Sequence, residues 1–158
     1  MRVGSGFDAH RLVEGRPLVL GGVTVPFTHG LLGHSDGDAL LHAVMDALLG
    51  AAGLGDMGRY FPSSDPRYAG ADSGELLRDV RDRLRRSGWR PGNVDATIVA
   101  ERPVLKDHLD AMRQSIAALL ELQPERVNVK AKSTDGLGAL GAGEGIAATA
   151  VALVEESE

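Results

Sequence analysis

A run of hydrophobic residues at helical spacing follows a short polar segment in the first third of the chain. The polar segment, 33–38, reads Gly-His-Ser-Asp-Gly-Asp. The apolar positions after it recur three or four residues apart, at Leu40, Leu41, Val44, Met45, Leu48 and Leu49. This spacing predicts an amphipathic helix that begins near residue 38, ends near the glycines of 50–55 and buries one face.

Shorter patterns predict the other elements. Apolar runs bounded by turn residues favour strands over 2–10, 93–100 and 127–132, and a hairpin over 17–26. Two further helical patterns begin near residues 72 and 107. The segment 146–154 is rich in alanine and valine and fits either a helix or a strand. We favour a strand that pairs with the others.

The composition limits the classes of function. The chain has 158 residues, a net charge of −5 and no cysteine. An acidic chain is a poor partner for nucleic acid, and no apolar run approaches the length of a membrane span. Because structured sequence follows Met1 directly, we expect no leader peptide and a cytoplasmic location. Without cysteine, any zinc site must use histidine and carboxylate ligands.

Polar side chains of the first strand and the first helix form a candidate metal site. Asp8 and His10 are two residues apart in a strand, so they point to the same side of the sheet. His42 lies in the helix, with Asp38 one turn before it and Asp46 one turn after it. One oxygen and two nitrogen donors suit a catalytic zinc ion with an open fourth position. The alternative is an ordinary packed histidine beside a solvated acidic face.

Two polar segments are candidates for binding hydroxyl groups or anions. The segment 56–66 carries acidic and serine side chains that could meet hydroxyls or a metal-bound phosphate, or could only form turns. The segment 133–145 is rich in glycine and follows Lys130 and Lys132. Its backbone amides and hydroxyls could cradle an anion.

The glycines of the second segment also match a dinucleotide-binding pattern. Gly136, Gly138 and Gly141 have the spacing of that fingerprint. The fold that uses it needs a helix, another strand and an acidic residue about 20 positions further on. Only 17 residues follow Gly141, so this function is excluded.

Several motifs together resemble the 2-C-methyl-D-erythritol 2,4-cyclodiphosphate synthases. They are Gly-Phe-Asp-Ala-His at 6–10, the segment 33–38 with His42, Leu-Gly-Asp-Met-Gly at 54–58, Phe-Pro at 61–62 with Asp-Pro at 65–66, and Asn-Val-Lys-Ala at 128–131 with Gly-Glu-Gly at 143–145. The resemblance covers essentially the whole chain, as one domain over 1–158. It implies an α+β fold, an α/β sandwich with a mixed sheet of four or five strands and helices packed on one face. It also implies a homotrimer with active sites between subunits.

The resemblance further implies an activity, that of a phosphorus–oxygen lyase in non-mevalonate isoprenoid biosynthesis. The substrate would be 4-diphosphocytidyl-2-C-methyl-D-erythritol 2-phosphate. Its 2-phosphate attacks the β-phosphorus, CMP leaves and a cyclic diphosphate forms. No protein nucleophile is needed, because phosphoryl transfer depends on positioning and charge neutralisation.

Site residues follow from the same resemblance. Asp8, His10 and His42 match the ligands of Zn²⁺ or another divalent cation, and Asp135 matches a glutamate that binds Mg²⁺ or Mn²⁺ with the substrate diphosphate. His34 and Ser133 match residues that stabilise the transition state. Contacts to the methylerythritol part are implied for Asp56, Phe61, Pro62, Ser63, Ser64 and Asp65. Substrate contacts of unspecified kind are implied for Asp8, His10, His34, Ser35, Met57 and Gly58. The cytidine and diphosphate pocket is implied for Ala100, Pro103, Val104, Leu105, Lys106, Lys132, Ser133, Thr134 and Asp135. We expect Asp38 and Asp46 to orient His42 behind the metal.

Some positions depart from the family pattern. Asp135 is one methylene shorter than glutamate, Val104 replaces a common lysine, and Lys132 replaces a frequent threonine. Ala139 and Ala142 replace the phenylalanine and arginine that help to form a cavity for an isoprenoid diphosphate on the trimer axis. The changes at 104, 135, 139 and 142 motivate one alternative to the synthase, a trimeric nucleotide- or metal-binding protein without turnover. A further alternative is a zinc hydrolase that makes free phosphate.

Overall fold

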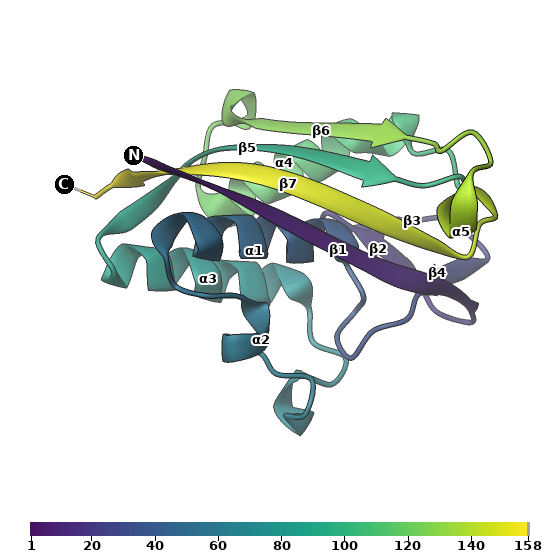
Figure 1. Cartoon of the computed structure of the whole chain (residues 1–158), viewed down its shortest axis with the longest axis horizontal. Coiled ribbons are helices and arrows are strands. Elements are labelled where there is room, and N and C mark those ends of the chain that lie inside the picture. Colours follow the sequence, from purple (N-terminus) through teal and green to yellow (C-terminus); the bar gives the residue numbers. More distant parts are fainter. Residues whose placement is uncertain (158) are drawn as a thin grey trace.

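A five-stranded mixed sheet forms one layer of the protein (Figure 1). The computed structural model describes residues 1–157. The strands lie in the order β4 (His29–Leu31), β1 (Arg2–Glu14), β7 (Gly145–Glu156), β5 (Trp89–Val99) and β6 (Val127–Lys132). A separate hairpin joins β2 (Leu18–Leu20) to β3 (Val23–Val25). The strand favoured for 146–154 is thus confirmed, and it lies in the centre of the sheet.

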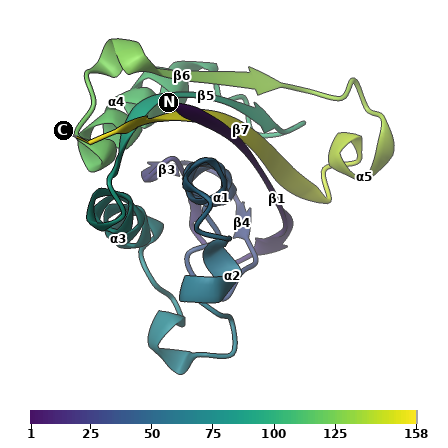
Figure 2. The same ribbon diagram turned by 60° about the vertical axis from the view of Figure 1, so that its left-hand side comes forward.

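Three long helices cover one face of this sheet (Figure 2). They are α1 (Ala39–Ala52), α3 (Ser73–Arg86) and α4 (Leu109–Leu120). The core between the two layers is mainly aliphatic, and the expectation of helices on one face is confirmed. No helix of the described residues combines the length and the apolar character needed to cross a membrane.

The β5–α4–β6 segment explains why the sheet is mixed. Parallel strands need a long crossover, and α4 supplies it between β5 and β6, the one parallel pair of the described strands. The glycine-rich segment at 136–141 instead ends in α5 (Gly138–Gly141), one turn of helix before β7. This arrangement agrees with the exclusion of a dinucleotide-binding fold.

Two glycines of β1 allow α1 to lie directly against the sheet. A Cβ atom on Gly6 would lie 2.0 Å from the carbonyl oxygen of Ala43, and one on Gly4 would lie 2.1 Å from that of Ala47. The strand partners of these glycines in β7 are also small, Ala150 and Ala152. The helix backbone therefore packs on a part of the sheet where no side chain is larger than a methyl group.

The opposite face of the sheet is exposed in a single chain. Val3, Phe7 and Val151 keep 66%, 63% and 49% of their surface accessible, and Figure 2 shows none of the three long helices over this face. Thr149 pairs with Phe7 and Val151 pairs with Ser5, so the apolar residues lie on adjacent strands. An exposed apolar sheet face of this kind is typical of a surface that binds another protein chain.

We predict that Gly6→Ala destabilises the protein while Gly50→Ala stabilises it. A methyl group at position 6 meets helix backbone, which cannot rotate away, so the cost should be about 3 kcal/mol, the upper end for overpacking. Position 50 of α1 has open space around it, and alanine should gain about 0.8–1 kcal/mol of helix propensity. Urea unfolding measures both, and equal effects of the two substitutions would contradict the packing argument.

Candidate functional site

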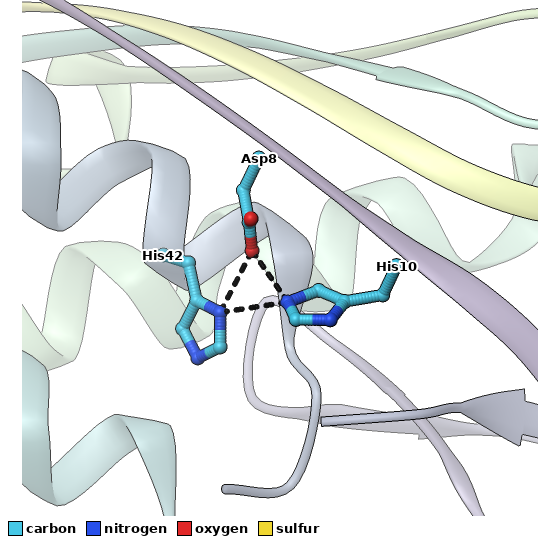
Figure 3. Close-up of side chains that lie close together, drawn as sticks. All are labelled: Asp8, His10 and His42. Atoms are coloured by element: carbon cyan, nitrogen blue, oxygen red, sulfur yellow. Dashed lines mark hydrogen bonds and ion pairs between the residues drawn. The ribbon is translucent and has the colours of Figure 1, made fainter. Parts of the chain in front are cut away.

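Asp8, His10 and His42 converge on one point between β1 and α1 (Figure 3). Asp8 Oδ2 lies 2.7 Å from His10 Nε2 and 2.8 Å from His42 Nδ1, and the two nitrogens are 3.2 Å apart. Donors around a tetrahedral zinc ion are separated by about 3.3 Å, given metal–ligand bonds of about 2.0–2.1 Å. A small outward movement of these side chains would therefore hold such an ion.

The hydrogen bond behind His10 leaves the correct nitrogen free. His10 Nδ1 lies 2.7 Å from the carbonyl oxygen of Leu32. A carbonyl only accepts, so Nδ1 carries the proton and Nε2 offers its lone pair to the shared point. The donor chemistry of the three residues thus fits a divalent cation.

The three side chains also affect one another's protonation. Burial raises the pKa of Asp8, but in the metal-free chain hydrogen bonds with His10 and His42, formed when those rings carry both protons, outweigh this and lower the pKa to about 2. The Asp8 carboxylate raises the pKa of His10 through its hydrogen bond, although burial opposes it. The cluster attracts positive charge, whether from a proton or from a metal ion.

The expectation that Asp38 and Asp46 orient His42 is wrong. His42 Nε2 instead lies 2.9 Å from Ser73 Oγ and 3.1 Å from Ser35 Oγ. The carboxylates at 38 and 46 accept hydrogen bonds from backbone N–H groups, including N–H groups that would be left without a partner at the start of a helix.

Asp38 connects the start of α1 to the β2–β3 hairpin. Its carboxylate accepts the N–H groups of Leu41, Gly21 and Gly22 at 2.8–2.9 Å, and it is fully buried. Burial raises its pKa to about 6, although the three N–H groups oppose this shift. Asp46 accepts the N–H of Met57 at 2.8 Å and so fixes the start of α2 (Met57–Tyr60).

A cavity of about 190 Å³ opens beside the cluster. Seven of the predicted residues line it, His10, His34, Ser35, His42, Met57, Phe61 and Ser63. Asp56 and Asp65 do not line it; they cap α2 and the turn at Pro66–Tyr68. The backbone oxygen of Asp65 accepts a hydrogen bond from His34 Nε2 at 2.9 Å, which holds His34 at the cavity.

A second cavity, of about 320 Å³, lies between the end of β5 and the end of β6. Its lining includes Ala100, Pro103, Val104, Leu105, Lys106, Lys132 and Ser133, as predicted. It shares no lining residue with the first cavity. The predicted substrate residues therefore fall into two separate groups within one chain.

The residues after β6 form a turn. Asp135 accepts a hydrogen bond from Ser133 Oγ at 3.1 Å and has a left-handed backbone, with φ of 52°. Lys130 is not free to bind an anion, because its Nζ lies 2.6 Å from Asp95 Oδ2. The suggested anion cradle is therefore reduced to Lys132 and the turn.

Comparisons with known proteins agree with this geometry. The model of the YgbB family matches residues 1–155. The chain belongs to the YgbB family. It is 62% identical over 153 residues to 2-C-methyl-D-erythritol 2,4-cyclodiphosphate synthase of Bordetella pertussis, covering 97% of this chain and 94% of that one.

Solved structures of related synthases have the same fold as this chain. A 2C-methyl-D-erythritol-2,4-cyclodiphosphate synthase in its CDP-bound form is 40% identical, with a TM-score of 0.89 and coverage of 98% of this chain and all of that one. The bifunctional IspDF of Campylobacter jejuni is 43% identical, with a TM-score of 0.96. The match covers 99% of this chain but only 42% of the bifunctional one.

Four lining residues of this YgbB-family chain were not predicted. Tyr68 and Leu76 complete the first cavity, and Leu109 and Ala131 contribute to the second. Tyr68 packs edge-on against Phe61, with ring centroids 5.4 Å apart. Its position just after the Asp-Pro pair at 65–66 was a usable signal, whereas Leu76 has the pattern of any buried helix residue.

We predict that Asp8→Asn changes the pH dependence of stability in the metal-free protein. Asp8 stabilises the fold above pH 3.8, and this contribution is lost as the pH falls toward 2. His10 stabilises it below pH 6.5, and that contribution is lost as the pH rises through the raised pKa. The difference in unfolding free energy between the two proteins should therefore be largest between pH 3.8 and 6.5. Urea unfolding with a chelator measures it, and a difference independent of pH would contradict the pairing.

Proposed function

We propose that this chain is a phosphorus–oxygen lyase that converts 4-diphosphocytidyl-2-C-methyl-D-erythritol 2-phosphate to 2-C-methyl-D-erythritol 2,4-cyclodiphosphate and CMP. An oxygen of the 2-phosphate forms a bond to the β-phosphorus, and the bond from that phosphorus to the oxygen of CMP breaks. The convergence of Asp8, His10 and His42 beside a cavity that contains His34 carries the proposal. The name of the Bordetella relative gives the substrate class.

The side chains around the first cavity bind and orient the reacting phosphates. Asp8, His10 and His42 would hold Zn²⁺ or another divalent cation, which acts as a Lewis acid on a phosphate oxygen. His34 Nε2–H donates to the backbone oxygen of Asp65, which holds the ring at the cavity. With a second proton on Nδ1, the imidazolium can stabilise negative charge that develops in the transition state. Met57, Phe61 and Ser63 enclose the methylerythritol part, with Asp56, Gly58, Pro62 and Ser64 in the same segment.

The second cavity suits the cytidine and diphosphate part. The side chains of Leu105 and Pro103 form an apolar part of its lining. Lys106 and Lys132 supply positive charge near the phosphates. Asp135 would hold Mg²⁺ or Mn²⁺ on the diphosphate, although its side chain is one methylene shorter than glutamate. The Ser133 hydroxyl donates to Asp135 in the free chain and would turn to the reacting phosphate once a cation occupies that carboxylate.

We further propose a homotrimer with each active site between two subunits. One substrate must contact both cavities, and these share no residue within a chain. The exposed apolar sheet face around Phe7 supplies a surface for association. The cavity beside His42 in one subunit would then face Lys132 and Ser133 of a neighbour.

We predict that the CDP-linked substrate with Mg²⁺ yields CMP and a cyclic diphosphate. Asp8→Ala or His42→Ala should slow CMP release at least about 100-fold, since loss of a metal ligand exceeds the cost of losing an outer partner. Gly50→Ala, distant from both cavities, serves as the matched control. Phosphorus NMR identifies the product: an acyclic product would indicate a hydrolase, and binding without CMP would indicate a non-catalytic protein.

We predict that Phe7→Asp lowers the mass in solution from trimer to monomer. A carboxylate at this position would be buried unpaired in an interface, which is costly. Ala118→Asp, at an exposed position of α4 on the other side of the molecule, is the control and should stay trimeric. Light scattering measures the masses, and a trimeric Phe7→Asp variant would exclude this sheet face as the interface.

A further inference from the structure

A chain of hydrogen bonds continues behind His42 to a carboxylate of another segment. His42 Nε2 lies 2.9 Å from Ser73 Oγ, and Ser73 Oγ lies 2.5 Å from Asp36 Oδ1. We propose that Asp36 and Ser73 are positioning residues that fix the tautomer of His42 required by a cation at Asp8, His10 and His42. This inference rests on the metal site of the proposed function.

The direction of each hydrogen bond follows from what each group can donate. An ionised carboxylate only accepts, so the single hydroxyl proton of Ser73 points to Asp36. Toward His42, Ser73 then offers only a lone pair, and Nε2 must supply the proton of that bond. Nδ1 is left unprotonated and faces the point shared with Asp8 and His10.

The hydrogen bonds from His42 to Ser73 and from Ser73 to Asp36, here called the relay, oppose the effect of Asp8 on the tautomer of His42. Asp8 Oδ2 lies 2.8 Å from His42 Nδ1 and, without a metal, favours a proton on that nitrogen. A proton there would block metal binding. Asp36 and Ser73 favour the proton on the other nitrogen, and so reduce the cost of preparing His42 as a ligand.

Ser35 cannot determine which nitrogen of His42 carries the proton. Its Oγ lies 3.1 Å from His42 Nε2, but its other hydrogen bond is a long one, 3.4 Å, from the N–H of Gly37. With no carboxylate to take its proton, the Ser35 hydroxyl can donate to His42 or accept from it. The directional information therefore comes from Ser73.

The relay is held rigidly by the backbone of two helix starts. Ser73 is fully buried as the first residue of α3, and its N–H donates to Asp36 Oδ2 at 2.9 Å. The N–H of Asp38 donates to Asp36 Oδ1 at 3.1 Å, just before α1. Asp36 thus connects the helix that carries His42 with the helix that carries Ser73.

We predict that Ser73→Ala weakens binding of Zn²⁺ to the metal-free full-length protein about 10–100-fold, as measured by competition with a chromophoric chelator. Asp36→Asn should weaken it similarly. If the amide oxygen keeps the N–H of Ser73, the amide NH₂ faces the hydroxyl and reverses its direction. Zinc binding by both variants at wild-type affinity would overturn the relay.

Asp72→Ala is the matched control. Asp72 caps the same end of α3 by accepting the N–H of Gly74 and makes no hydrogen bond to His42. Its loss should lower the urea midpoint of unfolding, yet leave zinc affinity unchanged. If Asp72→Ala weakened zinc binding as much as Ser73→Ala does, the effect would be one of helix order and the relay would be wrong.

The tautomer of His42 distinguishes the relay from a merely structural role of Ser73, because loss of a structural contact alone would not change it. In ¹⁵N-labelled metal-free protein, at a pH where the ring is neutral, long-range ¹H–¹⁵N NMR should show the Nε2–H form in the wild type and more of the Nδ1–H form in Ser73→Ala. An unchanged tautomer overturns the relay alone. If Asp8→Ala binds zinc as tightly as the wild type does, the metal site itself is wrong.

Discussion

The close contact between the β1 backbone and α1 is the constraint on which the site depends. Gly4 and Gly6 admit the helix, and the next two residues on the same face of the strand are Asp8 and His10. A bulkier strand would hold the helix several ångströms further away. The ligand on the helix, His42, would then be out of reach of the two ligands on the strand.

Hydrogen-bond acceptors prepare both imidazoles. The carbonyl of Leu32 accepts a hydrogen bond from His10 Nδ1, and the hydroxyl of Ser73, whose proton points to Asp36, accepts one from His42 Nε2. Each ring then turns its unprotonated nitrogen inward. The preparation comes from backbone and side-chain groups that touch neither the ion nor the substrate.

Local pattern in the sequence was enough to place the two ligand-bearing elements. Alternation in β1 put Asp8 and His10 on one face, and helical spacing put His42 on the inner side of α1. The same spacing misassigned Asp38 and Asp46, because it does not show which backbone N–H groups those carboxylates accept. Ser73 is 31 residues from His42 and reaches it only through tertiary packing, so no local pattern could reveal it.

The bond between Asp46 and the N–H of Met57 joins a wall of the first cavity to the helix of His42. An inhibitor that shifts the backbone at Met57 would stretch this bond and therefore pull on α1. Compounds designed to fill the space beside Phe61 can thus compete with metal retention without containing a chelating group. Their structure–activity relationships should be read with the metal content of the enzyme, not only with shape complementarity.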